Sequence, residues 1–206
     1  GVQTCALPIY ATNINNGITQ KTSYFYDNNG NVVSSGVAIV KPADSGVNVS
    51  VSIADQGQSN NNYISLYRYD VWNKLIGSSV GNNSATYGYN GDGLRTSKTV
   101  NGQTTNYLYE YDKVVLEEDG QGNEIARNVY GTNLLSRTAA GQTAYYMYNG
   151  HGDVTALMST TGSAIGIYYY DAFGNITESS GNANNPYTYA GYQYDKETGL
   201  YYCNAR

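Results

Sequence analysis

Three groups of residues have types and spacings that could support chemistry. His151 in NGHGDV could act as a general base, but no nucleophile motif accompanies it. Its place between two glycines favours a turn residue. The Gly-rich segment GYNGDG, residues 88–93, lacks the Lys-Ser or Lys-Thr of a phosphate-binding loop, so it does not support nucleotide binding.

The third group is a series of aspartates that each follow a tyrosine: Asp27, Asp70, Asp112, Asp171 and Asp195. Two carboxylates sharing one site could form an acid–base dyad. If each Asp instead occupies the same position in its own repeat, the five residues start separate turns and lie apart along the sheet. The turn interpretation is favoured, and we predict no catalytic residue. With two Cys and one His at no close spacing, we also predict no metal site, and no motif calls for a cofactor.

The aspartates belong to an internal repeat of about twenty residues. Its copies include YFYDNNGNV and YYYDAFGNI, and its mark is a Tyr-x-Tyr pair. The second tyrosines of the aligned pairs are Tyr26, Tyr69, Tyr89, Tyr111, Tyr148, Tyr170 and Tyr194. We predict that the rings of Tyr69, Tyr89, Tyr111, Tyr148 and Tyr170 occupy equivalent places and stack along one direction of the sheet. Residues 34–62 have no tyrosine pair and match the repeat poorly.

Each copy of the repeat predicts a strand, a tight turn and a second strand. In Tyr-x-Tyr both rings point to one face, because side chains alternate along a strand. The Asp then starts a turn, and Gly supplies a backbone angle that other residues avoid. We therefore expect turns at Asp27–Asn31, Asn101–Gly102 and Asp171–Asn175. The predicted fold class is all-β: repeated antiparallel hairpins in one long sheet, which must curl.

The residues assigned to the structural repeat motif are taken from four copies. They are Tyr24, Tyr26, Asp27, Gly30, Asn31, Tyr67, Tyr69, Asp70, Tyr168, Tyr170, Asp171, Gly174, Asn175, Tyr192, Tyr194, Asp195 and Gly199. Two further residues are interpreted by their place in the pattern. Trp72 is expected to pack between hairpins, and Cys203 to be a small buried apolar residue. No binding residue can be assigned from the pattern.

Composition and charge exclude several classes of protein. The chain has 24 Tyr but 2 Phe, 24 Gly, and 13% charged residues, which suits strands and turns better than helices. A net charge of −5 without a basic patch argues against a nucleic-acid partner. No apolar run is long enough to span a membrane.

The first nine residues, GVQTCALPI, share nothing with the repeats that follow. Written back into codons, they resemble a common short-read sequencing adaptor. We interpret residues 1–9 as translated adaptor sequence, which makes Cys5 an artefact and excludes this segment from the fold.

At the repeated motif Tyr-x-Tyr-Asp-x-x-Gly-Asn-Val/Ile/Leu the chain resembles the YD-repeat, or Rhs, family. Residues 10–165 match the repeats, with 34–62 degenerate. Residues 166–206 resemble the start of the Rhs repeat-associated core, through PYTYAGYQYDKETGLYYCNAR. The resemblance implies a hollow β-spiral shell from a polymorphic toxin that is secreted or exposed on a bacterial surface. Its partners would be neighbouring repeats and a C-terminal toxin or effector segment of the same polypeptide. That segment, and a self-cleaving aspartyl site, would follow Arg206.

Three functions from different classes fit these observations. The first is a structural, non-enzymatic module that encloses or presents the C-terminal effector. The second is a Tyr-rich cell-surface module that binds glycans, since aromatic rings can stack on sugars. The third is an enzyme, the self-cleaving protease of the core, with part of its fold in this chain. The sequence favours the first.

Overall fold

The computed structural model describes residues 10–15, 18–26, 29–40, 64–181 and 184–204, and its chain divides into two compact units. Unit 1 spans Gly1–Ser84 and unit 2 spans Ala85–Arg206. Both are built from antiparallel strands. Within the described residues the helical content is one short 3-10 turn, η1 (Tyr189–Gly191). None of these residues forms a helix long and apolar enough to cross a membrane.

Unit 1 contains an antiparallel meander, with each strand paired to the next along the chain. Its strands are β1 (Tyr10–Asn15), β2 (Ile18–Tyr26), β3 (Val32–Val40), β4 (Ile64–Tyr69) and β5 (Leu75–Val80). The poorly matching interval 34–62 begins inside β3 and continues beyond the described residues. Asp27, expected to start a turn, also lies outside them.

Unit 2 continues the same pattern and ends in a separate hairpin. Its meander strands are β6 (Asn83–Tyr89), β7 (Arg95–Val100), β8 (Gln103–Glu110), β9 (Lys113–Asp119), β10 (Glu124–Tyr130), β11 (Leu134–Ala139), β12 (Gln142–Tyr148), β13 (Val154–Met158), β14 (Ala164–Tyr170) and β15 (Ile176–Gly181). The hairpin pairs β16 (Gln193–Asp195) with β17 (Leu200–Tyr202). The predicted all-β fold of consecutive antiparallel hairpins is confirmed.

A five-residue turn recurs between strands and has the same hydrogen bonds each time. In the turn from Asp171 to Asn175, the Asp171 N–H donates to the Asn175 carbonyl at 3.0 Å. The Gly174 N–H donates back to the Asp171 carbonyl at 3.1 Å. The Asp171 carboxylate accepts from the N–H groups of Phe173 and Asn175 at 2.8 and 2.9 Å. A side-chain acceptor at the first position therefore closes the turn.

The same backbone bonds close five other turns, although the first residue varies. These turns are Asp70–Lys74, Asn90–Leu94, Asp119–Asn123, Asn149–Asp153 and Ser159–Ser163. The fourth residue always has a positive φ, and it is Gly in all except the first of these turns, where Asn73 has φ 62°. Trp72 is thus the third residue of its turn, and its side chain is 78% exposed. The expectation that it packs between hairpins is wrong, because the turn points this position away from the sheet.

The alignment of the fourth tyrosine is also wrong. Glu110 pairs with Lys113, so Tyr111 and Asp112 form a two-residue turn. Tyr111 has φ 58° and is 92% exposed. The equivalent pair is Tyr107 and Tyr109, two residues earlier. The error arises because YLYEYD contains two overlapping Tyr-x-Tyr pairs, and the last tyrosine, Tyr111, lies in the turn of the hairpin.

The hydroxyl groups show which tyrosines are equivalent. Tyr109, Tyr148 and Tyr170 each donate to the backbone carbonyl of a residue on an earlier strand, at 2.8–2.9 Å. These acceptors are the carbonyl oxygens of Arg95, Leu134 and Val154. The preceding members of two of these pairs, Tyr107 and Tyr146, are buried. The second ring of a pair thus satisfies its hydroxyl within the protein, rather than in water.

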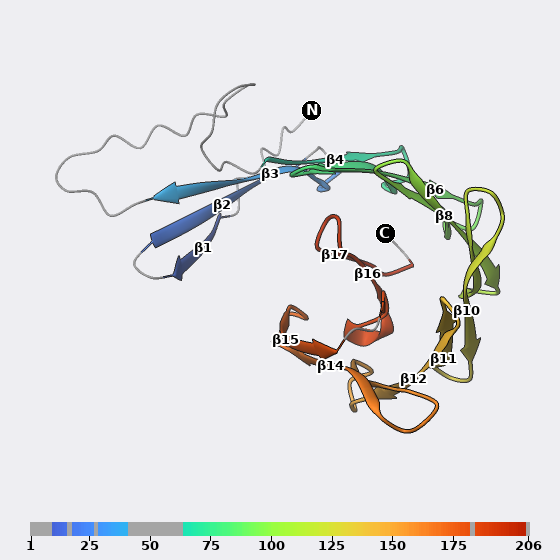
Figure 1. Cartoon of the computed structure of the whole chain (residues 1–206). Helices are drawn as coiled ribbons and strands as arrows, with labels where there is room; N and C mark the ends of the chain where they lie inside the picture. The colour runs from blue at the N-terminus through green and yellow to red at the C-terminus, as the bar shows by residue number, and fades with distance from the viewer. Residues whose placement is uncertain (1–9, 16–17, 27–28, 41–63, 182–183, 205–206) are drawn as a thin grey trace, which may run out of the picture. The chain divides into compact units, whose positions relative to one another are not determined.

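The strands of unit 2 curve, and the curve has an inner and an outer face. Figure 1 shows β6–β15 forming an arc, with β16 and β17 on its inner side. A core cluster of Leu134, Tyr146, Val154, Leu157 and Tyr187 joins the inner face to the C-terminal segment. Cys203, near the end of that segment, is exposed, so its expected burial is wrong.

We predict that Gly174→Ala destabilises the protein more than the same change at Gly162. Both glycines are fourth in their turns, with φ +85° and +81°. A Cβ at Gly162 would meet nothing within 4 Å, whereas at Gly174 it would lie 2.6 Å from Cδ1 of Tyr189. The left-handed backbone costs about 1 kcal/mol at either site. Overlap with the ring adds about 1–3 kcal/mol at Gly174. Urea unfolding followed by far-UV circular dichroism measures both, and equal losses would contradict the prediction.

Candidate functional site

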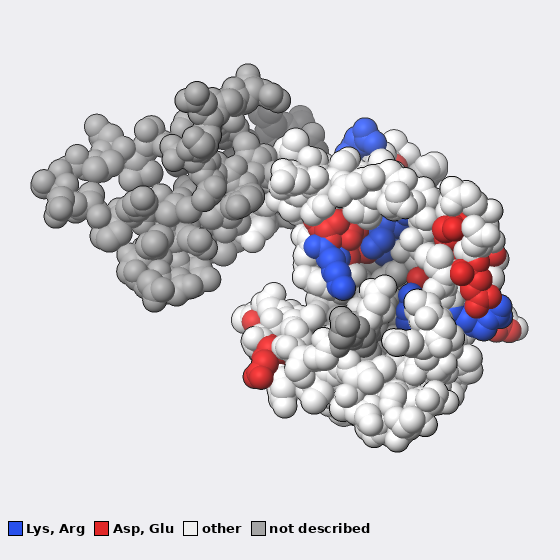
Figure 2. All heavy atoms as spheres, in the orientation of Figure 1, with Lys and Arg blue, Asp and Glu red and all other residues white. Residues whose placement is uncertain are grey.

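The candidate site is the inner face of β6–β15 together with the segment of residues 184–204 that covers it. This segment contains η1, β16 and β17. Figure 2 shows acidic and basic side chains gathered side by side in the hollow of unit 2. Because charged groups are rarely buried without partners, their pairing decides what this face can hold.

Arg95 at the start of β7 is the centre of the first contact. Its side chain is 2% exposed. Its Nη1 and Nη2 donate to the two carboxylate oxygens of Asp195 at 2.6 and 3.0 Å, and Nη2 also donates to Gln193 Oε1 at 2.9 Å. Burial alone would disfavour the charge, but the neighbouring Asp195 carboxylate raises the pKa of Arg95 above its ordinary value. The guanidinium therefore stays charged within the protein and fixes β16 to the sheet.

Other groups extend this contact on both sides. Lys98 Nζ lies 2.8 Å from Asp195 Oδ1 and 3.2 Å from Glu197 Oε1. The Arg95 N–H donates to the hydroxyl of Tyr202 at 2.8 Å, and the guanidinium carbon lies 4.2 Å from the centroid of that ring. Such cation–π contacts strengthen where water is excluded. The two strands of the C-terminal hairpin are therefore anchored by the same arginine.

A second buried pair lies further along the inner face, between β9 and β11. Arg137 Nη2 donates to Glu117 Oε2 at 2.9 Å, and Nη1 also contacts Glu117 and donates to Asn128 Oδ1 at 3.1 Å. Tyr187 of the C-terminal segment places its ring 5.8 Å from the Arg137 guanidinium. Burial, with the nearby Glu117 charge, raises the pKa of Tyr187 well above its ordinary value. The ring therefore remains a neutral hydroxyl donor to Glu117, at 3.4 Å.

A third contact joins the turn between β12 and β13 to η1. Asp153 Oδ1 accepts the backbone N–H of Ala190 at 2.9 Å and lies 2.9 Å from Nδ1 of His151. Asn149 Nδ2 donates to the other Asp153 oxygen at 2.7 Å. Burial disfavours the carboxylate, but these hydrogen bonds from His151, Asn149 and Ala190 lower the pKa of Asp153 overall. His151 thus lies in a turn, as the sequence indicates, and orients a carboxylate that holds the segment.

Tyrosine rings complete the contact at the turn between β14 and β15. Tyr189 lies with its ring centroid 5.3 Å from that of His151, 5.8 Å from Tyr170 and 5.9 Å from Tyr201. The Tyr201 hydroxyl donates to the Gly174 carbonyl at 3.0 Å. The turn of the repeat therefore also forms part of the surface that η1 and β17 contact.

Taken together, these groups bind and position a polypeptide segment. Among the described residues, the buried charged groups of the inner face pair with that segment or with one another, although Nε of Arg95 and of Arg137 has no hydrogen-bond partner. In the described part of the chain, no group of three or more His, Cys, Asp or Glu residues is placed to hold a metal ion.

The repeat-motif residues are distributed over the strands and turns as follows. Tyr24 and Tyr26 lie in β2, Tyr67 and Tyr69 in β4, Tyr168 and Tyr170 in β14, and Tyr194 in β16, whereas Tyr192 directly follows η1. Gly30 has φ +82°, Asn31 donates to Asn73 Oδ1 at 2.9 Å, and Asn175 donates to Asp171 Oδ2 at 2.7 Å. Gly199 donates its N–H to the Asp195 carbonyl at 2.8 Å. Asp195 thus begins a turn through its backbone, but its carboxylate binds Arg95.

Sequence reasoning did not single out the charged residues of the inner face. Arg95, Glu117 and Arg137 lie on strands, and charged residues at these positions would also be expected if that face of the strand were exposed to water. One signal was available for Arg137: it is the one charged residue in the segment LLSRTAA. The partner on a distant strand cannot be deduced from spacing, because a carboxylate 100 residues away supplies the pairing for Arg95.

Comparison with curated proteins finds relatives that are named as tRNA nucleases of Bacillus. The chain is 46% identical over 129 residues to the tRNA3(Ser)-specific nuclease WapA of Bacillus spizizenii, and 43% identical over 129 residues to the tRNA nuclease WapA of Bacillus subtilis. Each match covers 59% of this chain but 6% of the relative. No protein-family model matches the chain.

The sequence relatives, the repeated Tyr-Asp turns and the meander of hairpins all point to the same protein family. These findings support the resemblance of the chain to the Rhs, or YD-repeat, family. Solved structures show the same fold. The crystal structure of TcdB2-TccC3-Cdc42 matches 91% of this chain and 12% of its own with a TM-score of 0.57 at 17% identity. The Photorhabdus luminescens Tc holotoxin pore matches 91% of this chain and 11% of its own, with a TM-score of 0.55 at 16% identity.

We predict that Asp195→Ala strongly destabilises the inner face of these YD repeats. The change leaves Arg95 buried without its counter-charge, which costs about 3–5 kcal/mol when one partner of a buried pair is removed. The matched control is Glu124→Ala, which removes an exposed pair with Arg127 and should leave the urea midpoint unchanged. A midpoint for Asp195→Ala close to that of Glu124→Ala would contradict the assigned role of the pair.

Proposed function

We propose that the chain is a structural module of a toxin shell, whose inner face holds the polypeptide that leads to a C-terminal effector. One observation carries this proposal. Residues 184–204 leave the last repeat strand, turn to the inner side of the arc and are fixed there by Arg95, Arg137 and Asp153. A chain that continues from β17 would start from the inner side of the sheet.

The relatives support a toxin-associated role. The curated relatives are named as tRNA nucleases, and this chain spans 6% of their length. The solved structures with the same fold are toxin complexes. In the proposal, these repeats form part of the wall and another part of the full protein carries the activity. The full protein would be exported, to the medium or to the bacterial surface, where it meets its target.

The alternative is a surface module that binds glycans through its tyrosines. The inner rings are poorly suited to this, because Tyr107, Tyr146, Tyr187 and Tyr202 are buried beneath or within the C-terminal segment. Sugar stacking would need the outer face, where the exposed tyrosines include Tyr145 and Tyr169. Incubating the protein on a glycan array tests this alternative directly.

We predict that the full-length gene product protects the segment that follows residue 206 from a protease. Wild-type protein is digested under native conditions and the products are identified by mass spectrometry. The segment should be cut slowly, because the shell encloses it. In the Asp195→Ala variant it should be cut faster by at least about tenfold, because loss of the buried pair frees the leading polypeptide.

The Glu124→Ala variant serves as the control, since it removes an ion pair outside the inner face. Its cleavage rate should equal that of the wild type. Rapid cleavage of the downstream segment in wild-type protein would refute enclosure. Binding to glycans at micromolar concentration, together with rapid cleavage, would favour the surface module.

A further inference from the structure

The C-terminal hairpin of β16 and β17 contacts the inner face of unit 2 through two buried carboxylates. Asp195 Oδ2 lies 2.6 Å from Arg95 Nη1, and Asp195 Oδ1 lies 2.8 Å from Lys98 Nζ. Glu197 Oε1 lies 3.2 Å from Lys98 Nζ and accepts from the Tyr87 hydroxyl at 3.3 Å. The side chains of Asp195 and Glu197 are 5% and 7% exposed. Both charges are therefore held away from water against groups of β6 and β7.

These two carboxylates balance two cations that acid cannot discharge. The side chains of Arg95 and Lys98 are 2% and 15% exposed. A low pH leaves a guanidinium and an ammonium group charged, but it protonates a carboxylate. Protonation of Asp195 and Glu197 would therefore leave two cations at this contact without a counter-charge. Such cations are costly to keep buried, and they regain their hydration once the hairpin leaves.

The other groups around Asp195 cannot replace its charge. It faces the phenols of Tyr107 and Tyr202, and burial raises the pKa of both above the ordinary value. These phenols are therefore neutral at acidic pH. Gln193 Oε1 accepts from Arg95 at 2.9 Å, and it is an amide without charge. The hairpin keeps neutral hydrogen bonds to the sheet in acid, but it loses the ion pairs.

The sheet that carries the hairpin is joined by contacts that acid leaves in place. Its ladders are backbone hydrogen bonds, which do not titrate. Three of the five-residue turns close on an uncharged side chain at the first position, namely Asn90, Asn149 and Ser159. An Asp at that position still has an accepting oxygen when it is protonated. The buried pair of Glu117 and Arg137 joins β9 to β11, and backbone ladders through β10 also connect these strands.

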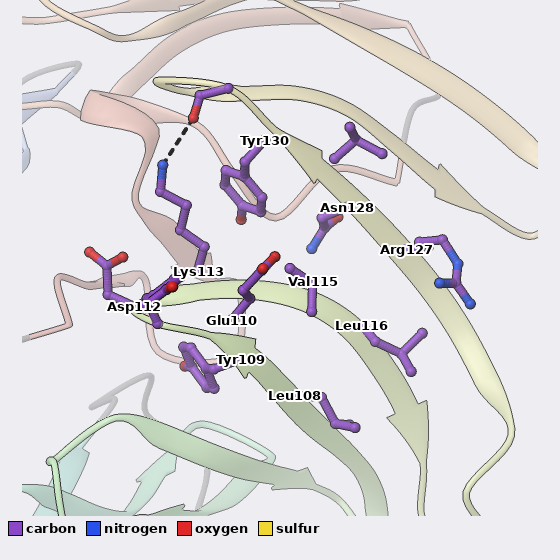
Figure 3. A pocket seen from close by; sticks show the side chains of 13 residues that line it. Leu108, Tyr109, Glu110, Asp112, Lys113, Val115, Leu116, Arg127, Asn128 and Tyr130 are labelled. Atoms are coloured by element: carbon purple, nitrogen blue, oxygen red, sulfur yellow. Dashed lines mark hydrogen bonds between the residues drawn. The ribbon is translucent and has the colours of Figure 1, made fainter.

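One interruption of the sheet is also bridged without a carboxylate. The ladder between β9 and β10 ends at Leu116 and Arg127. Beyond it, Lys113 Nζ donates to the Gly131 carbonyl at 3.0 Å, and Figure 3 shows this side chain reaching across the space between the strands. Asn128, on β10, donates its Nδ2 to a carbonyl of β9 at 2.8 Å. Both bonds persist at a pH that protonates carboxylates.

The part of the C-terminal segment that precedes the hairpin has a more acid-resistant contact. Tyr187 packs in the core cluster, and apolar packing does not depend on pH. Burial opposes the charge of Asp153, but hydrogen bonds from His151 and Asn149 lower the pKa of this carboxyl overall. A lowered pKa gives stability that is present above the unfolded value and is lost only as the pH falls through the folded value. The bond from the Ala190 N–H to Asp153 therefore survives below the ordinary pKa of an aspartate.

We propose that the hairpin β16–β17 is an acid-labile latch: protonation of Asp195 and Glu197 releases it from the inner face while β6–β15 stay folded. The driving force is the pair of cations, Arg95 and Lys98, that the protonated hairpin would leave buried without a counter-charge. The inference concerns the hairpin alone, and it holds whether or not the chain is part of a toxin shell. In such a shell, acid would free the polypeptide that continues from β17.

Amide hydrogen exchange of the whole chain, followed by mass spectrometry, tests the latch. The protein is equilibrated at several values between about pH 7 and about pH 3, and each rate is divided by that of the unfolded chain at the same pH. Protection of residues 193–202 should fall at least about tenfold between about pH 5 and about pH 3, whereas protection of β12–β14 should change less than about twofold. Loss of both at one pH, or a hairpin that stays protected until the sheet unfolds, would overturn the proposal.

Variants identify the groups that respond to acid. The double change Asp195→Asn and Glu197→Gln keeps the shape of both side chains without their charge, and should expose the hairpin at about pH 7 while far-UV circular dichroism of the sheet is unchanged. The double change Arg95→Met and Asp195→Leu replaces a buried pair by apolar groups, and should reduce the acid response from about tenfold to about threefold or less.

Asp119→Asn is the matched control, because it removes an exposed turn carboxylate at a position where other turns have Asn. Its hairpin protection should follow the wild type at every pH. An acid response of Arg95→Met with Asp195→Leu equal to that of the wild type would show that the buried pair is not the group that senses pH. An Asp195→Asn, Glu197→Gln hairpin as protected as the wild type at about pH 7 would also overturn the proposal.

Discussion

The ion pair between Arg95 and Asp195 is the interaction on which the arrangement of unit 2 depends. A guanidinium that is 2% exposed must find a counter-charge within the protein, since burying it alone would cost several kcal/mol. The strand that contains it can supply none, and the carboxylate comes instead from β16, 100 residues later. The need of Arg95 for a counter-charge thereby places β16 against the sheet. Arg137, beside the ring of Tyr187, and Asp153, which accepts the N–H of Ala190, contact the same segment at two further points.

The repeat provides the frame in which these contacts can form. Each five-residue turn is closed by an acceptor side chain at its first position, so hairpins follow one another with little variation. Regular hairpins place alternate residues on the same face throughout the arc. In the pairs that end at Tyr109 and Tyr148 the first tyrosine is buried, and the second donates its hydroxyl to a carbonyl on an earlier strand. Tyr suits these places better than Phe, because the rings of Tyr109, Tyr148 and Tyr170 pack and also donate to a backbone carbonyl.

The two faces of the sheet serve different purposes because they meet different surroundings. The inner face is closed by a segment of the same chain, and its charges are paired there. On the outer face the incomplete ladder between β9 and β10 leaves a groove with aliphatic and acidic parts. The pairing of β8 with β9 also shifts between Leu108 and Tyr109, as it does at the equivalent place in other hairpins, so Val115 is an extra residue in β9.

The sequence by itself determined the class of fold, the hairpin order and most turns, because these depend on contacts between residues a few positions apart. Tyr-x-Tyr, Asp-x-x-Gly-Asn and Asn-Gly each specify their backbone locally. Where two local patterns overlap, as in YLYEYD, the register at Tyr111 could not be chosen without the partner strand. The tertiary structure alone decided that Asp195 serves Arg95, that Trp72 and Cys203 are exposed, and that β9 and β10 separate. Those outcomes depend on burial and charge pairing between distant segments, and sequence spacing carries no information about such distances.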